Sequence, residues 1–371
     1  MISIPSLQCS RPNLWLRDHC QCSSCVHEVT KQRLLDTFEI PRDITMQSLS
    51  ETQEGFNVKC WWSDGHDSYY PKNWLNKFAR GDSSRERQGI NKASLWTSSI
   101  AESLPKVYFK DVMDTDQGVG QWLLNLRIYG FCFVEGCPPT PQDTERLLKR
   151  IAFIRQTHYG GFWDFTSDLA SKDTAYTQIS LEAHTDTTYF SDPAGLQLFH
   201  LLSHTHGSGG ASLLVDGFKA AQTLKQEDPK AYDMLSTIRL YSHASGNEDT
   251  SLQPYQSFPV LNHDVGTGEL IQVRWNNSDR AAIDAPFSEV QNWYNAAEKW
   301  VQILRDPSME YWEQLKPGMP LIFDNWRVLH GRSSFTGKRR LCGGYINRDD
   351  YISRFKMTNL GRAAVLESVI G

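Results

Sequence analysis

The chain has 371 residues, of which 40% are hydrophobic and 22% are charged, a balance typical of an ordinary globular protein with ample core. A net charge of -5 argues against general binding to nucleic acid or to membrane surfaces, and no apolar run is long enough to span a bilayer. The first residues lack the basic and apolar regions of a secretory signal, and eight cysteines are too few for a disulfide scaffold. We therefore expect a location in the cytoplasm or the mitochondrial matrix.

Three cysteines form a tight C-x-C-x2-C cluster near the start of the chain, at Cys20, Cys22 and Cys25. Such clustering favours metal binding over disulfides, and structural zinc nearly always has four ligands. We expect His66, in a turn-like segment, to be the fourth ligand, because histidines immediately beside the cysteines would strain a tetrahedral site. The alternative is three reduced thiols in a loop. A zinc ion at this place would be structural and would stabilise a small domain.

The following region predicts a domain boundary. Leu34–Leu75 contains short β-like runs separated by turns, and Ala79–Gln88 is polar and dense in charge. We place an N-terminal zinc-binding domain and linker at residues 1–90 and a larger domain at residues 91–371.

The larger domain combines strands with helices. Apolar residues at helical spacing predict helices at Asp114–Ile128, Pro141–Arg155, Phe218–Ser236 and Ser288–Leu304. Alternation predicts strands at Phe131–Val134, Ala211–Val215, Glu269–Trp275, Pro320–Phe323 and Leu341–Tyr345, and within Thr174–His206. We expect the apolar stripe of the last helix to serve core or dimer packing rather than a site. Short strands with helices outside them indicate a mainly β jelly-roll core.

The segment Leu181–Phe190 carries His184 and Asp186, and on a strand two such residues point to the same side. His330 lies at the end of another apolar run far downstream. Two histidines and a carboxylate are the ligand set of non-haem Fe(II) oxygenases, in which open positions receive a co-substrate and O2. Arg339 is expected on the next strand, facing the same cavity, where its fork would hold the far carboxylate of 2-oxoglutarate. The alternative for the isolated H-x-D pair is an ordinary core or surface histidine.

Several segments together resemble the trimethyllysine and γ-butyrobetaine hydroxylase branch of the 2-oxoglutarate oxygenases. They are LWLRDHCQCSSC, DTAYT, HTDTTYF, LLVDGF, RWNNSDRA, FDNWRVLHGR and RRLCGGY. The resemblance extends from about Asn13 to Arg354, and His66 falls where the family's fourth zinc ligand lies. It implies a double-stranded β-helix that carries iron, preceded by a small zinc-bearing domain, in a homodimer.

The resemblance also implies the cofactors and their ligands. By motif position, His184, Asp186 and His330 would hold Fe(II), and Arg339 would hold 2-oxoglutarate with help from Ser212. The implied reaction consumes O2 and 2-oxoglutarate, and such an Fe(II) enzyme benefits from ascorbate.

A trimethylammonium group cannot donate N–H bonds, so proteins hold it between aromatic faces by cation–π attraction. Tyr159, Trp163 and Tyr176 match the positions of the family's aromatic cage. Core packing is the alternative for each of them in a chain this rich in aromatic residues.

The two substrates of the family differ in their head groups. The resemblance places Asp173 there, where a carboxylate would attract the α-ammonium of trimethyllysine and repel the bare carboxylate of γ-butyrobetaine. Asn276 or Asn277 would then serve the carboxylate of the substrate. We therefore expect hydroxylation of trimethyllysine at C3, which begins carnitine biosynthesis. The alternatives are hydroxylation of γ-butyrobetaine and, from another class, a non-catalytic module that binds methyl-lysine.

Overall fold

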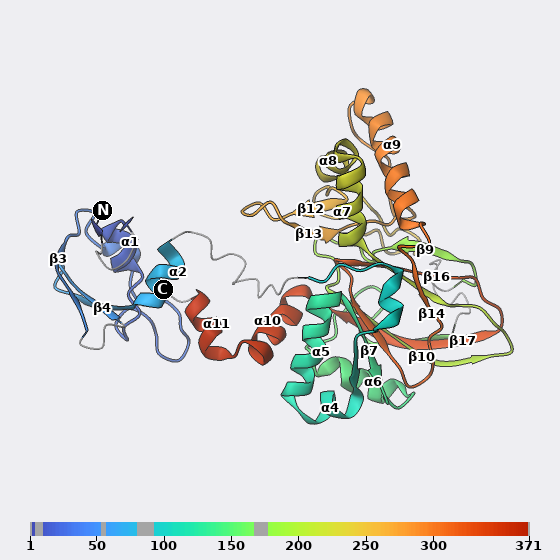
Figure 1. Cartoon of the computed structure of the whole chain (residues 1–371), viewed down its shortest axis with the longest axis horizontal. Helices are drawn as coiled ribbons and strands as arrows, with labels where there is room; N and C mark the ends of the chain where they lie inside the picture. The colour runs from blue at the N-terminus through green and yellow to red at the C-terminus, as the bar shows by residue number, and fades with distance from the viewer. Residues whose placement is uncertain (1, 4–9, 53–56, 80–92, 167–176, 370–371) are drawn as a thin grey trace. The chain divides into compact units, whose positions relative to one another are not determined.

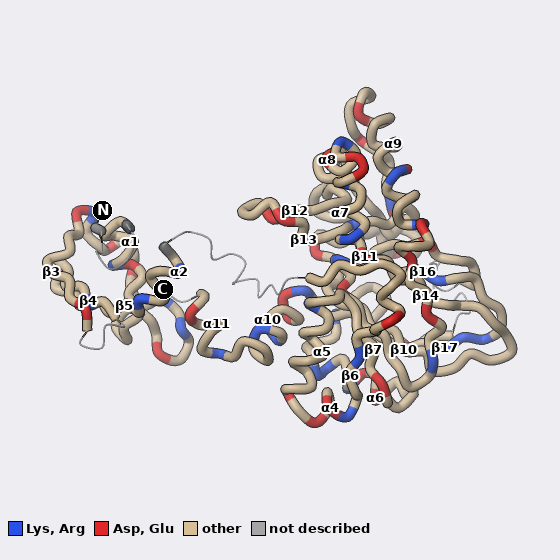
Figure 2. The backbone as a smooth tube through the Cα atoms, viewed as in Figure 1, with Lys and Arg blue, Asp and Glu red and all other residues tan. Residues whose placement is uncertain are grey.

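The computed structural model describes residues 2–3, 10–52, 57–79, 93–166 and 177–369, so Asp173 and Tyr176 lie outside the described residues. Contacts divide the chain into two compact units, Met1–Ile90 with Leu360–Gly371 and Asn91–Asn359 (Figure 1). Basic and acidic residues are interspersed along both units (Figure 2). Within the described ranges, every helix is too short or too polar to cross a bilayer.

The first unit is built on a three-stranded antiparallel sheet in the order β3–β4–β5. Alternate residues of β4, Val58, Cys60 and Trp62, face the core, where they meet Tyr70 and Trp74. The strands confirm the predicted β-like runs, although the end of that region is helical. The elements are β1 (Ile2–Ser3), β2 (Ser10–Arg11), α1 (Asn13–Asp18), η1 (Thr37–Glu39), β3 (Met46–Glu51), β4 (Asn57–Trp62), β5 (Asp67–Pro71), α2 (Lys72–Ala79) and α11 (Arg362–Val369).

The second unit contains a six-stranded sheet in the order β6–β7–β15–β10–β17–β8 and a four-stranded sheet in the order β14–β11–β16–β9. All pairs are antiparallel except β6 with β7. This arrangement confirms the mainly β, double-stranded β-helix core. The strands are β6 (Lys106–Tyr108), β7 (Phe131–Glu135), β8 (Trp163–Thr166), β9 (Leu181–His184), β10 (Leu196–Thr205), β11 (Ser212–Asp216), β14 (Tyr311–Glu313), β15 (Leu321–Asp324), β16 (Val328–Arg332) and β17 (Lys338–Ile346), with a separate hairpin of β12 (Leu261–His263) and β13 (Leu270–Val273).

Helices cover the outer faces of both sheets (Figure 1). Against the six-stranded sheet lie α4 (Phe109–Asp114), α5 (Asp116–Tyr129), α6 (Pro141–Lys149) and α10 (Arg348–Asn359). Against the four-stranded sheet lie α7 (Gly217–Glu227), α8 (Pro229–Thr237) and α9 (Phe287–Leu304), and η2 (Ser98–Glu102) precedes β6. The outer faces of the two sheets are therefore shielded from solvent.

Two of the predicted helices differ from the observed ones. The helix predicted at Pro141–Arg155 ends at Lys149, because Ile154 instead forms a bridge with Ile346 at the sheet. The single helix predicted at Phe218–Ser236 is two helices, because Pro229 cannot continue α7 and begins α8, which Asp228 caps through the amide of Ala231. Helix α5 ends before Gly130, whose left-handed φ of 81° suits glycine.

Candidate active site

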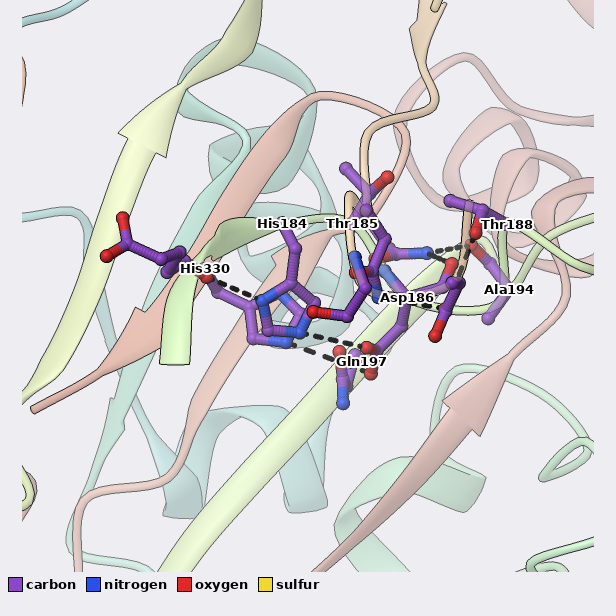
Figure 3. Close-up of polar contacts among 12 residues, drawn as sticks. His184, Thr185, Asp186, Thr188, Ala194, Gln197 and His330 are labelled. Carbon is purple, nitrogen blue, oxygen red and sulfur yellow. Dashed lines mark hydrogen bonds and ion pairs between the residues drawn. The ribbon is translucent and has the colours of Figure 1, made fainter. Parts of the chain in front are cut away.

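The strands β9 and β16 place two histidines side by side. Their antiparallel register pairs His184 with His330, and the two ring centroids are 4.4 Å apart. Asp186 lies in the turn after β9, so the expectation that it shares a strand with His184 is wrong. The chain reverses at Thr187, whose φ is 59°, and this turn still directs the carboxylate to the histidines. Oδ1 of Asp186 is 3.3 Å from Nε2 of His184, and Oδ2 is 3.7 Å from Nε2 of His330 (Figure 3).

The three side chains fit a divalent metal such as Fe(II). Adjacent ligands of an octahedral ion are roughly 3 Å apart, close to the separations found here. Nδ1 of His184 donates to the carbonyl of Glu182 over 2.7 Å, which leaves the lone pair on Nε2, the nitrogen that faces Asp186. Burial, with a contribution from His184, lowers the pKa of His330 to about 3, so this imidazole is neutral as a metal ligand must be.

Neighbouring side chains fix the position of Asp186. Asn325 accepts from its amide over 2.8 Å and donates to its carbonyl and to that of Ala194, each over 3.0 Å. The hydroxyl of Tyr345 donates to Oδ2 of Asp186 over 2.8 Å, and Nε2 of Gln197 donates to that hydroxyl over 3.4 Å. Burial raises the pKa of Tyr345 well above its ordinary value, so the phenol keeps its proton. Sequence reasoning assigned none of these supporting roles.

A cavity of about 810 Å³ opens beside the three side chains and is lined by both sheets and by α9. Arg339 faces it from β17, which is the next strand along the chain but belongs to the opposite sheet. Arg339 is 3% exposed, and among the described residues no carboxylate pairs with it and its buried Nε has no partner. Burial, helped by Arg332, lowers its pKa to about 10, so it stays cationic at neutral pH. A buried cation without a counter-charge suits an anionic ligand, and 2-oxoglutarate supplies such a carboxylate.

Ser212 and the predicted aromatic residues also line this cavity. Ser212 begins β11, within the strand predicted at Ala211–Val215, and its side chain is buried. The hydroxyls of Tyr159 and Tyr189 are 3.2 Å apart, and the rings of Trp163 and Tyr345 are 6.2 Å apart. Tyr189 and Tyr345 therefore extend the aromatic wall, although sequence reasoning named only Tyr159 and Trp163 among the described residues.

The predicted asparagines lie in a loop after β13. That strand ends at Val273, and both asparagines line the cavity. Nδ2 of Asn276 donates to Asp279 over 2.8 Å, whereas Oδ1 of Asn277 accepts from Arg280 over 3.3 Å.

Helix α9 contributes to the cavity as well as to the core. Trp293, Ala297 and Leu304 are buried in the cluster beneath the helix, as the apolar stripe predicted. The same three residues, together with Tyr294 and Val301, also line the cavity.

In the first unit the structure brings together Cys20, Cys22, Cys25 and His66. Nε2 of His66 lies 3.3, 3.5 and 3.5 Å from the three sulfurs in that order. Tetrahedral zinc with bonds of about 2.3 Å to sulfur separates its ligands by roughly 3.7 Å, so the set fits this ion and leaves no open position. Burial raises the pKa of Cys25 to about 12, against a hydrogen bond from Arg17, so without a metal this thiol keeps a proton that zinc would displace.

Comparisons with known proteins match nearly the whole chain. Residues 96–345 match the family model for taurine catabolism dioxygenase TauD, TfdA family, and residues 6–76 match that for gamma-butyrobetaine hydroxylase-like, N-terminal. The chain is 50% identical to a trimethyllysine dioxygenase of Neurospora crassa, over 97% of this chain and 83% of the relative. It is 41% identical to the mitochondrial trimethyllysine dioxygenase of Homo sapiens (94% and 82%) and 33% identical to a gamma-butyrobetaine dioxygenase of Pseudomonas sp. (92% and 88%). A crystal structure of a taurine dioxygenase from Burkholderia xenovorans shares the fold, with a TM-score of 0.51 at 13% identity over 70% of this chain and 90% of that one.

Proposed function

We propose, since the chain belongs to the trimethyllysine dioxygenase family of Fe(II)/2-oxoglutarate oxygenases, that it hydroxylates trimethyllysine at C3, the reaction that begins carnitine biosynthesis. One combined observation supports the proposal. The chain is similar to trimethyllysine dioxygenases over nearly its full length, and its two histidines, aspartate and buried arginine line one cavity. Hydroxylation of γ-butyrobetaine is the second candidate, because a gamma-butyrobetaine dioxygenase is a more distant relative.

The residues of the chain would bind and orient the reactants. His184, Asp186 and His330 would hold Fe(II) on one face, and Arg339, with help from Ser212 on the same cavity wall, would hold the far carboxylate of 2-oxoglutarate. With O2 and 2-oxoglutarate, the iron supplies chemistry that converts a C–H bond to C–OH and releases succinate and CO2. Because the ligands lie on the cavity wall, the substrate must be held with C3 toward them, which is catalysis by orientation.

Aromatic faces would hold the trimethylammonium group. Tyr159 and Trp163, with Tyr189 and Tyr345, supply the wall for cation–π attraction, which is worth about 2 kcal/mol when the contact is desolvated. Tyr176 is proposed as a further member from the resemblance alone.

At the other end of the substrate, Asp173 is proposed from the resemblance as a partner of the α-ammonium, and Asn276 or Asn277 as partners of the carboxylate. Asn277 is the better candidate, because the amide nitrogen of Asn276 is already used by Asp279. An Asp173→Asn variant should shift preference toward γ-butyrobetaine by about tenfold, the worth of one partly shielded charge pair. An unchanged ratio of kcat/KM for the two substrates would remove Asp173 from the site.

Turnover followed by mass spectrometry tests the function. Purified protein with Fe(II), ascorbate and 2-oxoglutarate is offered trimethyllysine and γ-butyrobetaine in parallel, with His330→Ala as the inactive control. We expect a product heavier by one oxygen from trimethyllysine, formed together with an equal amount of succinate. Such a product from γ-butyrobetaine alone would refute the substrate. An absence of succinate with both, and no iron bound after anaerobic reconstitution, would favour a methyl-lysine binding module.

Assembly, location and the role of zinc are also proposed from the resemblance. We propose a homodimer, which sedimentation velocity would test, and a mitochondrial location, since mammalian relatives are named mitochondrial. The Cys20, Cys22, Cys25 and His66 cluster would hold structural zinc, because its four donors leave no position for a substrate.

A further inference from the structure

The loop Asn276–Arg280 begins directly beside the three metal-ligand candidates. The amide of Thr185 donates to the carbonyl of Trp275 over 2.7 Å, and the amide of Trp275 donates to Oγ1 of Thr185 over 3.0 Å. Thr185 stands between His184 and Asp186 in the chain. These bonds anchor the start of the loop at the metal site, and every residue of the loop lines the cavity.

The chemistry of trimethyllysine determines where its amino-acid head must lie. C3 is bonded to the α-carbon, so the α-nitrogen and the carboxylate carbon are each about 2.5 Å from the reacting atom. The quaternary nitrogen is four bonds away, at about 5 Å when the chain is extended. The groups that hold the head must therefore adjoin the metal site, while the aromatic wall can lie farther along the cavity.

Asp279 is a carboxylate held rigidly at this place. Its Oδ2 accepts from Nδ2 of Asn276 over 2.8 Å and from Oγ1 of Thr188 over 3.5 Å. Thr188 follows Asp186 by two residues, so the loop is tied to the metal site a second time. A carboxylate fixed in this way complements an ammonium group.

Arg280 presents the opposite charge from the next position. Its guanidinium lies over the rings of Trp293 and Tyr294, at 5.2 and 5.7 Å, and donates through Nε to Asn277 and through Nη1 to the carbonyl of Ala281. In the part of the chain that the structure describes, no carboxylate lies within ion-pair distance of it. A stacked cation on a cavity wall without a counter-charge suits a carboxylate.

We propose that Asp279 also binds the α-ammonium and Arg280 also binds the α-carboxylate of the substrate, each in addition to the partner proposed above from the resemblance, which makes this pair a clamp for a zwitterionic amino-acid head. The inference rests on the proposed function and deepens it. γ-Butyrobetaine has a carboxylate but no second cation, so Asp279 discriminates between the two substrates whereas Arg280 serves either.

Substrate analogues separate the two halves of the clamp. Asp279→Asn and Arg280→Gln are assayed with trimethyllysine, with its analogue lacking the α-amino group and with its analogue lacking the carboxylate. Asp279→Asn should lower kcat/KM for trimethyllysine about 10- to 100-fold, the worth of a charge-assisted hydrogen bond, and leave the deamino analogue unchanged. Arg280→Gln should do the same for trimethyllysine and leave the decarboxy analogue unchanged. Calorimetric titration of trimethyllysine into Mn(II)- and 2-oxoglutarate-loaded protein under nitrogen should show matching losses in Kd without turnover.

Two control variants test for general effects of charge. Asp284→Asn removes an exposed carboxylate a few residues beyond the loop, and Arg305→Gln removes a cavity-lining cation that already pairs with Glu182. Neither should alter the ratio of kcat/KM between trimethyllysine and its analogues. The inference would be overturned if Asp279→Asn lowered kcat/KM equally for trimethyllysine and for the deamino analogue. It would also be overturned if Asp173→Asn, but not Asp279→Asn, lowered kcat/KM for trimethyllysine alone. Wild-type protein that does not oxidise trimethyllysine would instead overturn the proposed function.

Discussion

Replacing Tyr345 with Phe removes one hydroxyl from the support of the metal site. That hydroxyl donates to Oδ2 of Asp186 over 2.8 Å and is itself approached by Gln197. The ring can stay in place, because it packs edge to face against Trp163 with the ring centroids 6.2 Å apart. The change therefore tests what the hydrogen bond does for the aspartate rather than what the ring does for the core.

A hydrogen bond to a charged group contributes about 1.5–3 kcal/mol, and this one holds Oδ2 of Asp186 while Oδ1 faces Nε2 of His184. Without it Asp186 can rotate, and the metal loses a pre-oriented ligand. We expect the Kd for Fe(II) to rise about 10- to 100-fold, the range found when outer-shell partners of metal ligands are removed.

Anaerobic calorimetric titration with Fe(II) measures this effect directly. The matched control is Tyr311→Phe, which removes another buried tyrosine hydroxyl that donates to a carboxylate, that of Glu313, away from the three ligands. Fe(II) affinity should fall in Tyr345→Phe and stay at the wild-type value in Tyr311→Phe. Unchanged affinity in the first variant, or equal losses in both, would refute the reasoning.

Three other perturbations address separate sites. Arg339→Gln should raise the KM for 2-oxoglutarate at least tenfold and leave the Kd for Fe(II) unchanged, because Arg339 is a buried cation that reaches no metal ligand. His66→Ala should lower the zinc content measured by elemental analysis and reduce the thermal stability of the protein, without changing the iron content. His200 is buried between Thr144 and the amide of Gly318, and burial lowers its pKa to about 4. His200 therefore binds a proton below about pH 6.5 in the unfolded chain but only below about pH 4 in the folded chain. The free energy of unfolding falls between pH 6.5 and 4. In urea unfolding, the wild type should lose about 2 kcal/mol more than His200→Gln between pH 7 and 5, and parallel losses would contradict this assignment.

The metal ligands could be predicted from the sequence because their residue types and the motifs around them indicate metal binding. The residue types and motifs predicted His184, Asp186 and His330 as metal ligands. The structure brings them together even though Asp186 lies in a turn rather than on the strand. Cys20 and His66, which are 46 residues apart in the chain, are likewise brought together, with Sγ and Nε2 3.3 Å apart. A metal site tolerates such an error about backbone geometry, because only the positions of the ligand atoms matter.

The supporting residues could not be predicted in the same way, because their roles depend on which strands face each other. Tyr345 lies on β17 of one sheet and reaches an aspartate that follows β9 of the other, and no local pattern indicates that pairing. Asn325 lies in a motif that resembles the family, yet its bonds to the backbone of Asp186 appear only once the turn after β15 is placed beside the turn after β9.

The opposed sheets also explain why His330 and Arg339 can serve one cavity although few residues separate them. β16 and β17 are consecutive strands, but each pairs within a different sheet, so their inward side chains approach from opposite walls. Had the two strands formed a hairpin in one sheet, the arginine would lie beside the histidine and its charge would oppose metal binding. Placed on the facing wall, Arg339 leaves room for a dicarboxylate between itself and the metal ligands. A charge-preserving Arg339→Lys variant should therefore bind Fe(II) normally while still losing 2-oxoglutarate affinity, since lysine supplies the charge without the bidentate fork.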